Sequence, residues 1–145
     1  MTKDLFRYAV VEEAISWLGT PYHPQARIKG LGVDCAMFPS AVYEAVGLIP
    51  RIEPTYTQDW MMHRDEEKFL EFVTPYAREI TREEAGPGDF VIWKFGRTYS
   101  HSAIIVDLPE VIHAVIKGGA VIRADMDTDV DLIDRPVKFY TVFGD

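Results

Sequence analysis

The only cysteine of the chain, Cys35, follows a glycine-rich stretch and precedes a run of apolar residues at helical spacing. The run from Phe38 to Val46 predicts a helix that ends at Gly47, so Cys35 lies at or near a helix N-terminus. Unpaired N–H groups and the helix dipole favour an anion there, and both a thiolate and an oxyanion are anions. A lone cysteine is also among the most frequently buried residues, so a structural role stays open.

Two histidines in the second half of the chain are candidate partners for this thiol. His101 begins one expected strand, and His113 lies in the middle of the next. If residues 107–109 form a three-residue hairpin loop, Val106 pairs with Glu110 and Ala103 pairs with His113. His101 then lies one diagonal step from His113 on the same face, about 7 Å away between β-carbons. A register shifted by one residue would place the two imidazoles on opposite faces.

The order of these residues indicates a type of chemistry. A cysteine on a helix N-terminus, a histidine on a strand and a polar orienting residue on the next strand are the parts of a papain-like thiol hydrolase.

The elements that must position these residues fall into two halves. Apolar spacing predicts a helix over Asp4–Leu18 and a further helix over Asp65–Val73, and the polar residues 22–29 predict a surface loop. From Gly86 onward, short β-branched or aromatic segments separated by turn residues predict a sheet. The five expected strands are Phe90–Phe95, Ser100–Val106, Val111–Val115, Ala120–Ala124 and Val137–Phe143. Helices first and closely linked strands second predict an α+β fold with an antiparallel sheet.

Length and composition limit the function classes. The 145 residues fit a single domain, expected over residues 1–145, and 48% hydrophobic with 26% charged residues is typical of a globular chain. A net charge of −8 argues against a nucleic-acid partner. A single cysteine excludes an internal disulfide and a multi-cysteine metal site, and we expect no metal or cofactor.

The hydropathy of the chain bears on its location. The N-terminal residues lack the apolar core of a signal peptide, and no apolar run is long enough to span a membrane. We therefore expect synthesis in the bacterial cytoplasm and no membrane partner. A chain that acts outside the cell would then need another route out.

Five short motifs stand in a fixed order along the chain. They are Leu18–Tyr22, Gly32–Cys35, Pro87–Asp89, Ser100–Ile104 and Ile112–Ala114. In order and spacing they resemble the NlpC/P60 cell-wall peptidases, and the match spans about Leu18 to Arg123. Three further stretches, Gln25-Ala26, Lys29-Gly30 and Tyr56–Trp60, are similar to the subgroup encoded in phage tail clusters and gene transfer agents.

The resemblance implies a papain-like fold and hydrolysis of the stem peptides of peptidoglycan. The bond that such enzymes cleave joins γ-D-glutamate to a diamino acid such as diaminopimelate. The resemblance makes Cys35 the nucleophile and His101 the residue that takes its proton and later protonates the leaving amine. It makes His113 the residue that fixes the tautomer and orientation of His101. It makes Tyr22 a residue that holds the substrate or the oxyanion, and Asp34 the acid that recognises the substrate's amine.

Several alternatives remain open at this level. Tyr22 can simply cover the edge of the core, and Asp34 can simply cap the helix. Gln25 is a weaker candidate for an oxyanion donor. Many family members carry serine and glycine where this chain has Ala36 and Met37, so the sequence does not predict a strict requirement for a free N-terminal alanine.

Three functions are compatible with these observations. The first is a peptidoglycan endopeptidase carried by a phage-type tail, with stem peptides and tail-tip proteins as partners. The second is a structural tail-tip protein that keeps the fold without the chemistry. The third is a related thiol amidase or acyltransferase, because the same residues can transfer an acyl group to water or to an amine.

Overall fold

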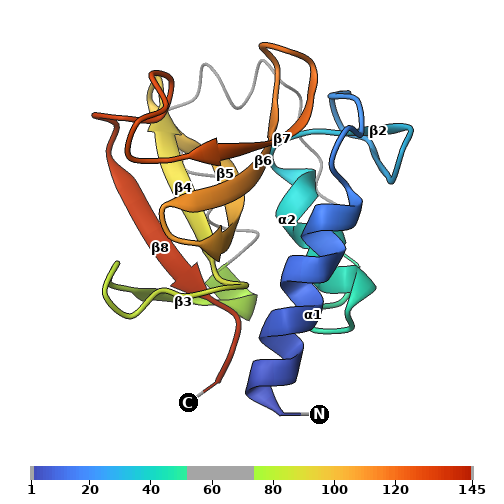
Figure 1. The fold of residues 1–145 in the computed structure, drawn as a ribbon, viewed down its shortest axis with the longest axis vertical. Helices are drawn as coiled ribbons and strands as arrows, with labels where there is room; N and C mark the ends of the chain where they lie inside the picture. The colour runs from blue at the N-terminus through green and yellow to red at the C-terminus, as the bar shows by residue number, and fades with distance from the viewer. Residues whose placement is uncertain (1, 52–73, 145) are drawn as a thin grey trace.

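The computed structural model describes residues 2–51 and 74–144 (Figure 1). The first half contains α1 (Lys3–Ser16), the short strands β1 (Arg27–Ile28) and β2 (Gly32–Val33), and α2 (Met37–Ala45). The second half opens with a short 3-10 helix (Thr74–Tyr76) and then forms a sheet. Its strands are β3 (Arg78–Ile80), β4 (Phe90–Phe95), β5 (Thr98–Asp107), β6 (Glu110–Val115), β7 (Ala120–Asp125) and β8 (Val137–Thr141). The helix expected over Asp65–Val73 and the Tyr56–Trp60 motif lie outside the described residues.

Both helices that flank the cysteine motif are confirmed. The side chain of Thr2 caps α1 by accepting a hydrogen bond from the N–H of Leu5 at 3.3 Å. After α2, Gly47 has a φ of 80°, the left-handed conformation that commonly ends a helix. Within residues 2–51 and 74–144, no helix is long and apolar enough to cross a membrane.

The main sheet has six strands rather than the five expected. Its order is β3-β8-β4-β5-β6-β7, and every pair of neighbours is antiparallel, as predicted. The additional strand, β3, is three residues long and pairs only with β8 at one edge of the sheet. A segment this short carries no period-2 pattern, so the sequence could not indicate it.

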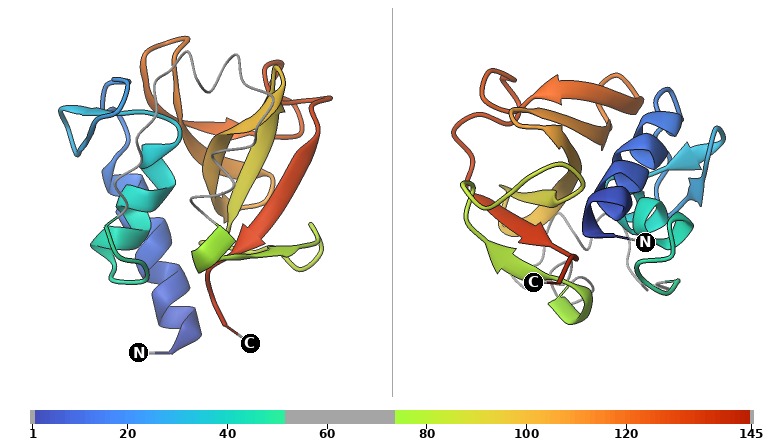
Figure 2. Two further views of the ribbon diagram at one scale, coloured as in Figure 1. Left: turned by 180° about the vertical axis from the view of Figure 1, so that it is seen from behind. Right: turned by 60° about the horizontal axis from the view of Figure 1, so that its bottom comes forward.

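Two hydrophobic clusters fix the sheet in place. Figures 1 and 2 show α1 and α2 side by side along one side of the sheet, and both helices contact β5. The first cluster lies between helices and sheet and includes Val10, Trp17, Phe38, Val42, Phe90, Ile92, Ile104 and Ile112. The second lies on the opposite face of the sheet and includes Val91, Trp93, Ala103, Ile105, Val111 and Leu132. Because side chains alternate along a strand, β4 and β5 are buried on both faces.

The register between β5 and β6 decides where the two histidines lie. Ile104 pairs with Ile112 and Ile105 with Val111, which is the central register expected from the sequence. The pairing expected near the loop is wrong, because Asp107 and not Val106 pairs with Glu110. A bulge between Ile105 and Asp107 takes up the extra residue, so the central register is unchanged and both imidazoles lie on one face.

Candidate active site

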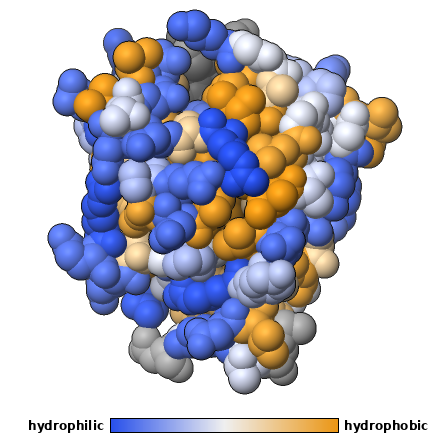
Figure 3. Space-filling model, viewed as in Figure 1, coloured by the Kyte–Doolittle hydropathy of each residue, from blue (hydrophilic) through white to orange (hydrophobic). Residues whose placement is uncertain are grey.

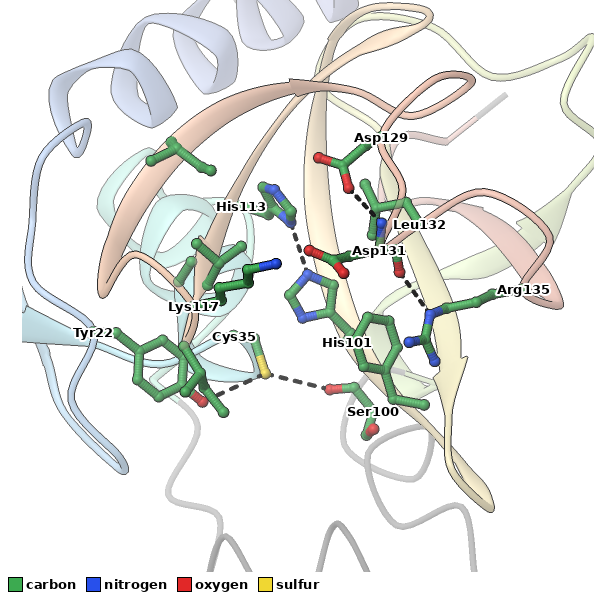
Figure 4. A pocket seen from close by; sticks show the side chains of 15 residues that line it. Tyr22, Cys35, Ser100, His101, His113, Lys117, Asp129, Asp131, Leu132 and Arg135 are labelled. Atoms are coloured by element: carbon green, nitrogen blue, oxygen red, sulfur yellow. Dashed lines mark hydrogen bonds between the residues drawn. The ribbon is translucent and has the colours of Figure 1, made fainter.

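A cavity of about 370 Å³ brings together four of the five residues singled out in the sequence. Cys35, His101, His113 and Tyr22 all line it, and Figure 4 shows their side chains directed into one space. Asp34 is not among the lining residues. Much of the remaining lining is apolar and comes from Phe95, Val115, Ile116, Ile122 and Leu132. On the surface, hydrophobic side chains gather in the middle of the face drawn in Figure 3.

The two imidazoles form a hydrogen bond with each other. Nε2 of His101 and Nδ1 of His113 are 2.7 Å apart, and both side chains are buried. The rings of Trp93 and Phe95 pack against His101, at centroid distances of 5.7 and 4.8 Å. Figure 4 shows the other nitrogen of His101, Nδ1, on the side of the ring that faces Cys35. The packing therefore holds His101 in one orientation, with one nitrogen toward the thiol and one toward His113.

Both histidines are neutral at neutral pH. Burial lowers the pKa of His101 well below its usual value, and the charges of His113 and Arg135 lower it further. Burial also lowers the pKa of His113 to about 4, although the nearby carboxylates of Asp129 and Asp131 oppose this shift. Among the described residues, Nε2 of His113 has no hydrogen-bond partner. A neutral His101 can accept a proton, which is what a general base must do.

The thiol of Cys35 is held by β5 and by Tyr22. Sγ donates to the carbonyl oxygen of Ser100 at 3.6 Å and accepts from the hydroxyl of Tyr22 at 3.9 Å. Ser102 Oγ donates to the carbonyl oxygen of Cys35 itself at 2.6 Å. The residues on both sides of His101 therefore position the backbone and the thiol of Cys35. Sequence reasoning missed Ser102, although its place next to His101 puts its side chain on the opposite face of the same strand.

The lowered thiol pKa expected at a helix N-terminus is wrong. Burial and, to a smaller extent, the charge of Asp34 raise the pKa of Cys35 to about 12, although the hydrogen bond from Tyr22 opposes this shift. The backbone N–H groups of Cys35 and Ala36 lower the pKa of the thiol, but burial raises it more. Two further N–H groups of the first helical turn already have partners. Met37 N donates to Oδ1 of Asp34 at 2.8 Å, and Phe38 N donates to the carbonyl oxygen of Asp34 at 3.0 Å. The resting pair is therefore a neutral thiol and a neutral imidazole.

Asp34 has the structural role that the sequence left as an alternative. Its side chain is buried, and its second oxygen, Oδ2, accepts from the N–H of Gln25 at 2.6 Å. Gln25 has a φ of 64°, a backbone conformation that residues other than glycine seldom adopt. Asp34 thus caps α2 and also fixes the loop before the cysteine. Recognition of a substrate amine by Asp34, and an oxyanion role for Gln25, stay predictions.

The cavity also contains a cation that sequence reasoning missed. Arg135 lies between β7 and β8, and its Cζ is 3.6 Å from the centroid of the Phe95 ring. No pattern in the sequence connects Arg135 with Cys35, since 100 residues separate them and only the fold places both around one cavity. Among residues 2–51 and 74–144, no group of three His, Cys, Asp or Glu side chains is arranged to hold a metal ion.

Solved structures with the same fold include two peptidoglycan hydrolases. The NlpC/p60 domain of the peptidoglycan hydrolase SagA matches with a TM-score of 0.60 and 23% identity, over 91% of this chain and 96% of that domain. The peptidoglycan hydrolase RipB of Mycobacterium tuberculosis has a TM-score of 0.64 and 16% identity, and the match covers 100% of this chain and 70% of RipB. An NLP/P60 family protein of Staphylococcus aureus, described as similar to lipoprotein, has a TM-score of 0.71 and 20% identity. The match covers 99% of this chain but 43% of the staphylococcal one.

Sequence comparison gives the family. A search of curated protein sequences gave no significant match. The model of the NlpC/P60 family, in contrast, matches residues 19–131, which include the cysteine motif and both strands that carry the histidines. The structures named above share the fold of this chain. The chain therefore belongs to the NlpC/P60 family.

Proposed function

We propose that this chain is a thiol endopeptidase that hydrolyses the stem peptides of peptidoglycan between γ-D-glutamate and a diamino acid. The observation that carries the proposal is the 2.7 Å contact of His101 with His113 in the cavity that also holds Cys35. Family membership and the similar fold of two peptidoglycan hydrolases support the substrate class.

The acylation half of the reaction starts from the neutral pair. His101 Nδ1 takes the proton of the thiol while Sγ of Cys35 forms a bond to the carbonyl carbon of the substrate. His101 Nε2–H donates to Nδ1 of His113, which fixes the tautomer that leaves Nδ1 of His101 free. Because burial raises the pKa of the thiol, the proton moves together with the attack rather than before it.

The second half of the reaction returns the proton. The imidazolium of His101 protonates the leaving nitrogen, the C–N bond breaks, and a thioester to Cys35 remains. Water then attacks the thioester with His101 as base, which releases the acid and restores the thiol. Tyr22 is suited to donate to the oxyanion, since burial raises the pKa of its hydroxyl and keeps it protonated.

Two finer assignments rest on sequence motifs. Carriage by a phage-type tail, with tail-tip proteins as partners, rests on the stretches similar to the tail-encoded subgroup. Synthesis in the cytoplasm fits this route, because release with particles would bring the enzyme to the wall. Mass spectrometry of purified particles tests both assignments, since the chain must be present in the particles and not only in the cell extract.

The apolar lining of the cavity supports one second candidate, a thiol acyltransferase or amidase. Val115, Ile116 and Leu132 offer a surface that an acyl chain could cover. Such an enzyme would form the same thioester but would pass the acyl group to a different acceptor or accept a different amide.

Defined stem peptides distinguish these functions. The purified chain is incubated with a disaccharide-linked stem peptide, and mass spectrometry identifies the new termini. The proposal expects a free amine on the diamino acid and a new carboxylate on D-glutamate, with no product from Cys35→Ala. Cleavage at another amide would favour the amidase, and equal product from Cys35→Ala would remove the thiol from the mechanism.

A further inference from the structure

We propose that Arg135 forms a carboxylate-binding subsite on the leaving-group side of the cavity. This inference rests on the proposed function and adds a feature of its substrate. The amino acid released by cleavage would carry a free carboxylate at the distal end of its side chain. The cavity as a whole then selects substrates by the charge of the leaving group.

The guanidinium of Arg135 is fixed in place before any substrate binds. Nε donates to the carbonyl oxygen of Asp131 at 2.6 Å, and Nη1 donates to the carbonyl oxygen of Lys94 at 3.4 Å. The guanidinium lies over the Phe95 ring, with Cζ 3.6 Å from the centroid. Because these contacts already hold the guanidinium of Arg135 in one position, little of its conformational entropy is lost when a ligand binds.

The positive charge of Arg135 is not neutralised by the described part of the chain. No carboxylate of residues 2–51 or 74–144 lies within 4.0 Å of it, although other arginines, such as Arg7, Arg82 and Arg123, form ion pairs. Arginine has five N–H donors, and its two contacts here use two of them. The remaining donors can form the paired hydrogen bonds that a carboxylate accepts.

The position of Arg135 relates it to the leaving group. The ring of Phe95 packs against both Arg135 and His101, at 3.6 Å from Cζ of Arg135 and 4.8 Å from the centroid of His101. His101 must protonate the leaving nitrogen, so the leaving amino acid lies on the His101 side of the cavity. Figure 4 shows Arg135 on that side, across His101 and away from Tyr22.

Three other charged residues line the cavity and define the ligand further. Lys117 lies on the turn between β6 and β7, and it is exposed, so its ammonium lacks the fixed position of the Arg135 guanidinium. Asp129 and Asp131 also line the cavity, and their two carboxylates would attract an ammonium group of a ligand. A carbon that carries both an ammonium and a carboxylate, as at the distal end of diaminopimelate, matches these charges. The side chain of lysine offers the ammonium alone.

Two matched substrates test the subsite. One stem peptide contains diaminopimelate with a free distal carboxylate, and the other has a carboxamide at the same carbon. We expect kcat/KM of the parent to be roughly 10- to 100-fold higher for the carboxylate, the size of a charged hydrogen bond. In Arg135→Gln this ratio should fall to near one. Because the ratio is taken within each variant, a general disturbance of the loop affects both substrates alike.

Lys117→Gln is the matched control, since it removes a cation from the same cavity. It should keep the parent's ratio, and Arg135→Lys, which keeps the charge without the paired donors, should have an intermediate ratio. A parent that cleaves both peptides equally overturns the subsite while leaving the peptidase intact. A ratio that persists in Arg135→Gln, or that disappears in Lys117→Gln, also overturns it.

Binding measurements separate the subsite from the proposed function. Cys35→Ala cannot form the thioester, so calorimetric titration gives Kd values for the two peptides without turnover. If the parent cleaves neither peptide, the proposed function fails. The ratio of the two Kd values, compared between Cys35→Ala and its combination with Arg135→Gln, then decides on Arg135 alone. A higher affinity for the carboxylate that requires Arg135 supports the subsite, and equal affinities overturn it.

Discussion

Replacement of His113 by asparagine separates the orienting role of this residue from its titration. Oδ1 of the asparagine occupies nearly the place of Nδ1, which lies 2.7 Å from Nε2 of His101. The variant therefore keeps an acceptor for His101 and removes a buried imidazole. We expect His113→Asn to retain appreciable hydrolysis of stem peptides at neutral pH.

The same variant should change how the stability of the fold depends on pH. His113 has a pKa of about 4 in the folded chain, against about 6.5 for an unperturbed histidine. Between these values the unfolded chain binds more protons, so the folded state loses stability as the pH falls from 6.5 toward 4. For His113 the free energy of unfolding should fall by about 2 kcal/mol between pH 7 and pH 5. The lowered pKa of His101 adds a loss of the same sign.

Urea unfolding at pH 7 and pH 5 measures this difference. The acid-induced loss should be smaller in His113→Asn than in the parent by about 2 kcal/mol, because that contribution is absent. Any cavity left by the smaller side chain lowers stability at both pH values and cancels in the comparison. His23→Asn is the control, since His23 is exposed, and it should behave as the parent does. If His113→Asn loses as much stability as the parent, our account of the buried imidazole is refuted.

Three further predictions concern the thiol and its surroundings. His101→Asn should lower hydrolysis of stem peptides more than about 100-fold, because an amide cannot carry a proton, and a loss no larger than that of His113→Asn would contradict these roles. Iodoacetamide should label Cys35 slowly at pH 7 and faster above about pH 9, since burial raises the thiol pKa to about 12; fast labelling below pH 7 would contradict this. Ser102→Ala should lower kcat about tenfold with little change in KM, because the carbonyl of Cys35 loses its donor. Ser40→Ala is the control, because the hydroxyl of Ser40 also donates to a backbone carbonyl, and it should leave kcat unchanged. An equal fall of kcat in both variants would mean that Ser102 is merely structural.

The sequence alone predicted most of the described elements and the principal residues of the candidate site. Apolar spacing and Gly47 located α2, and short β-branched segments located five of the six strands. These features are local, because the period of apolar residues reflects the geometry of one helix or strand. The central register of β5 and β6 also followed from the sequence, since it depends on a short connection between adjacent strands. That register placed His101 and His113 on one face.

The tertiary structure decided the properties that depend on residues far apart in the chain. Asp34 accepts from the N–H groups of Met37 and Phe38, and burial by the assembled fold raises the pKa of Cys35. Ser102 reaches the carbonyl of Cys35 because the sheet packs against α2. Arg135 lines the cavity because the β7–β8 connection packs against the other face of the sheet. A pKa and a binding subsite depend on desolvation and on distances in space, and neither quantity is encoded in the spacing of residues along a single element.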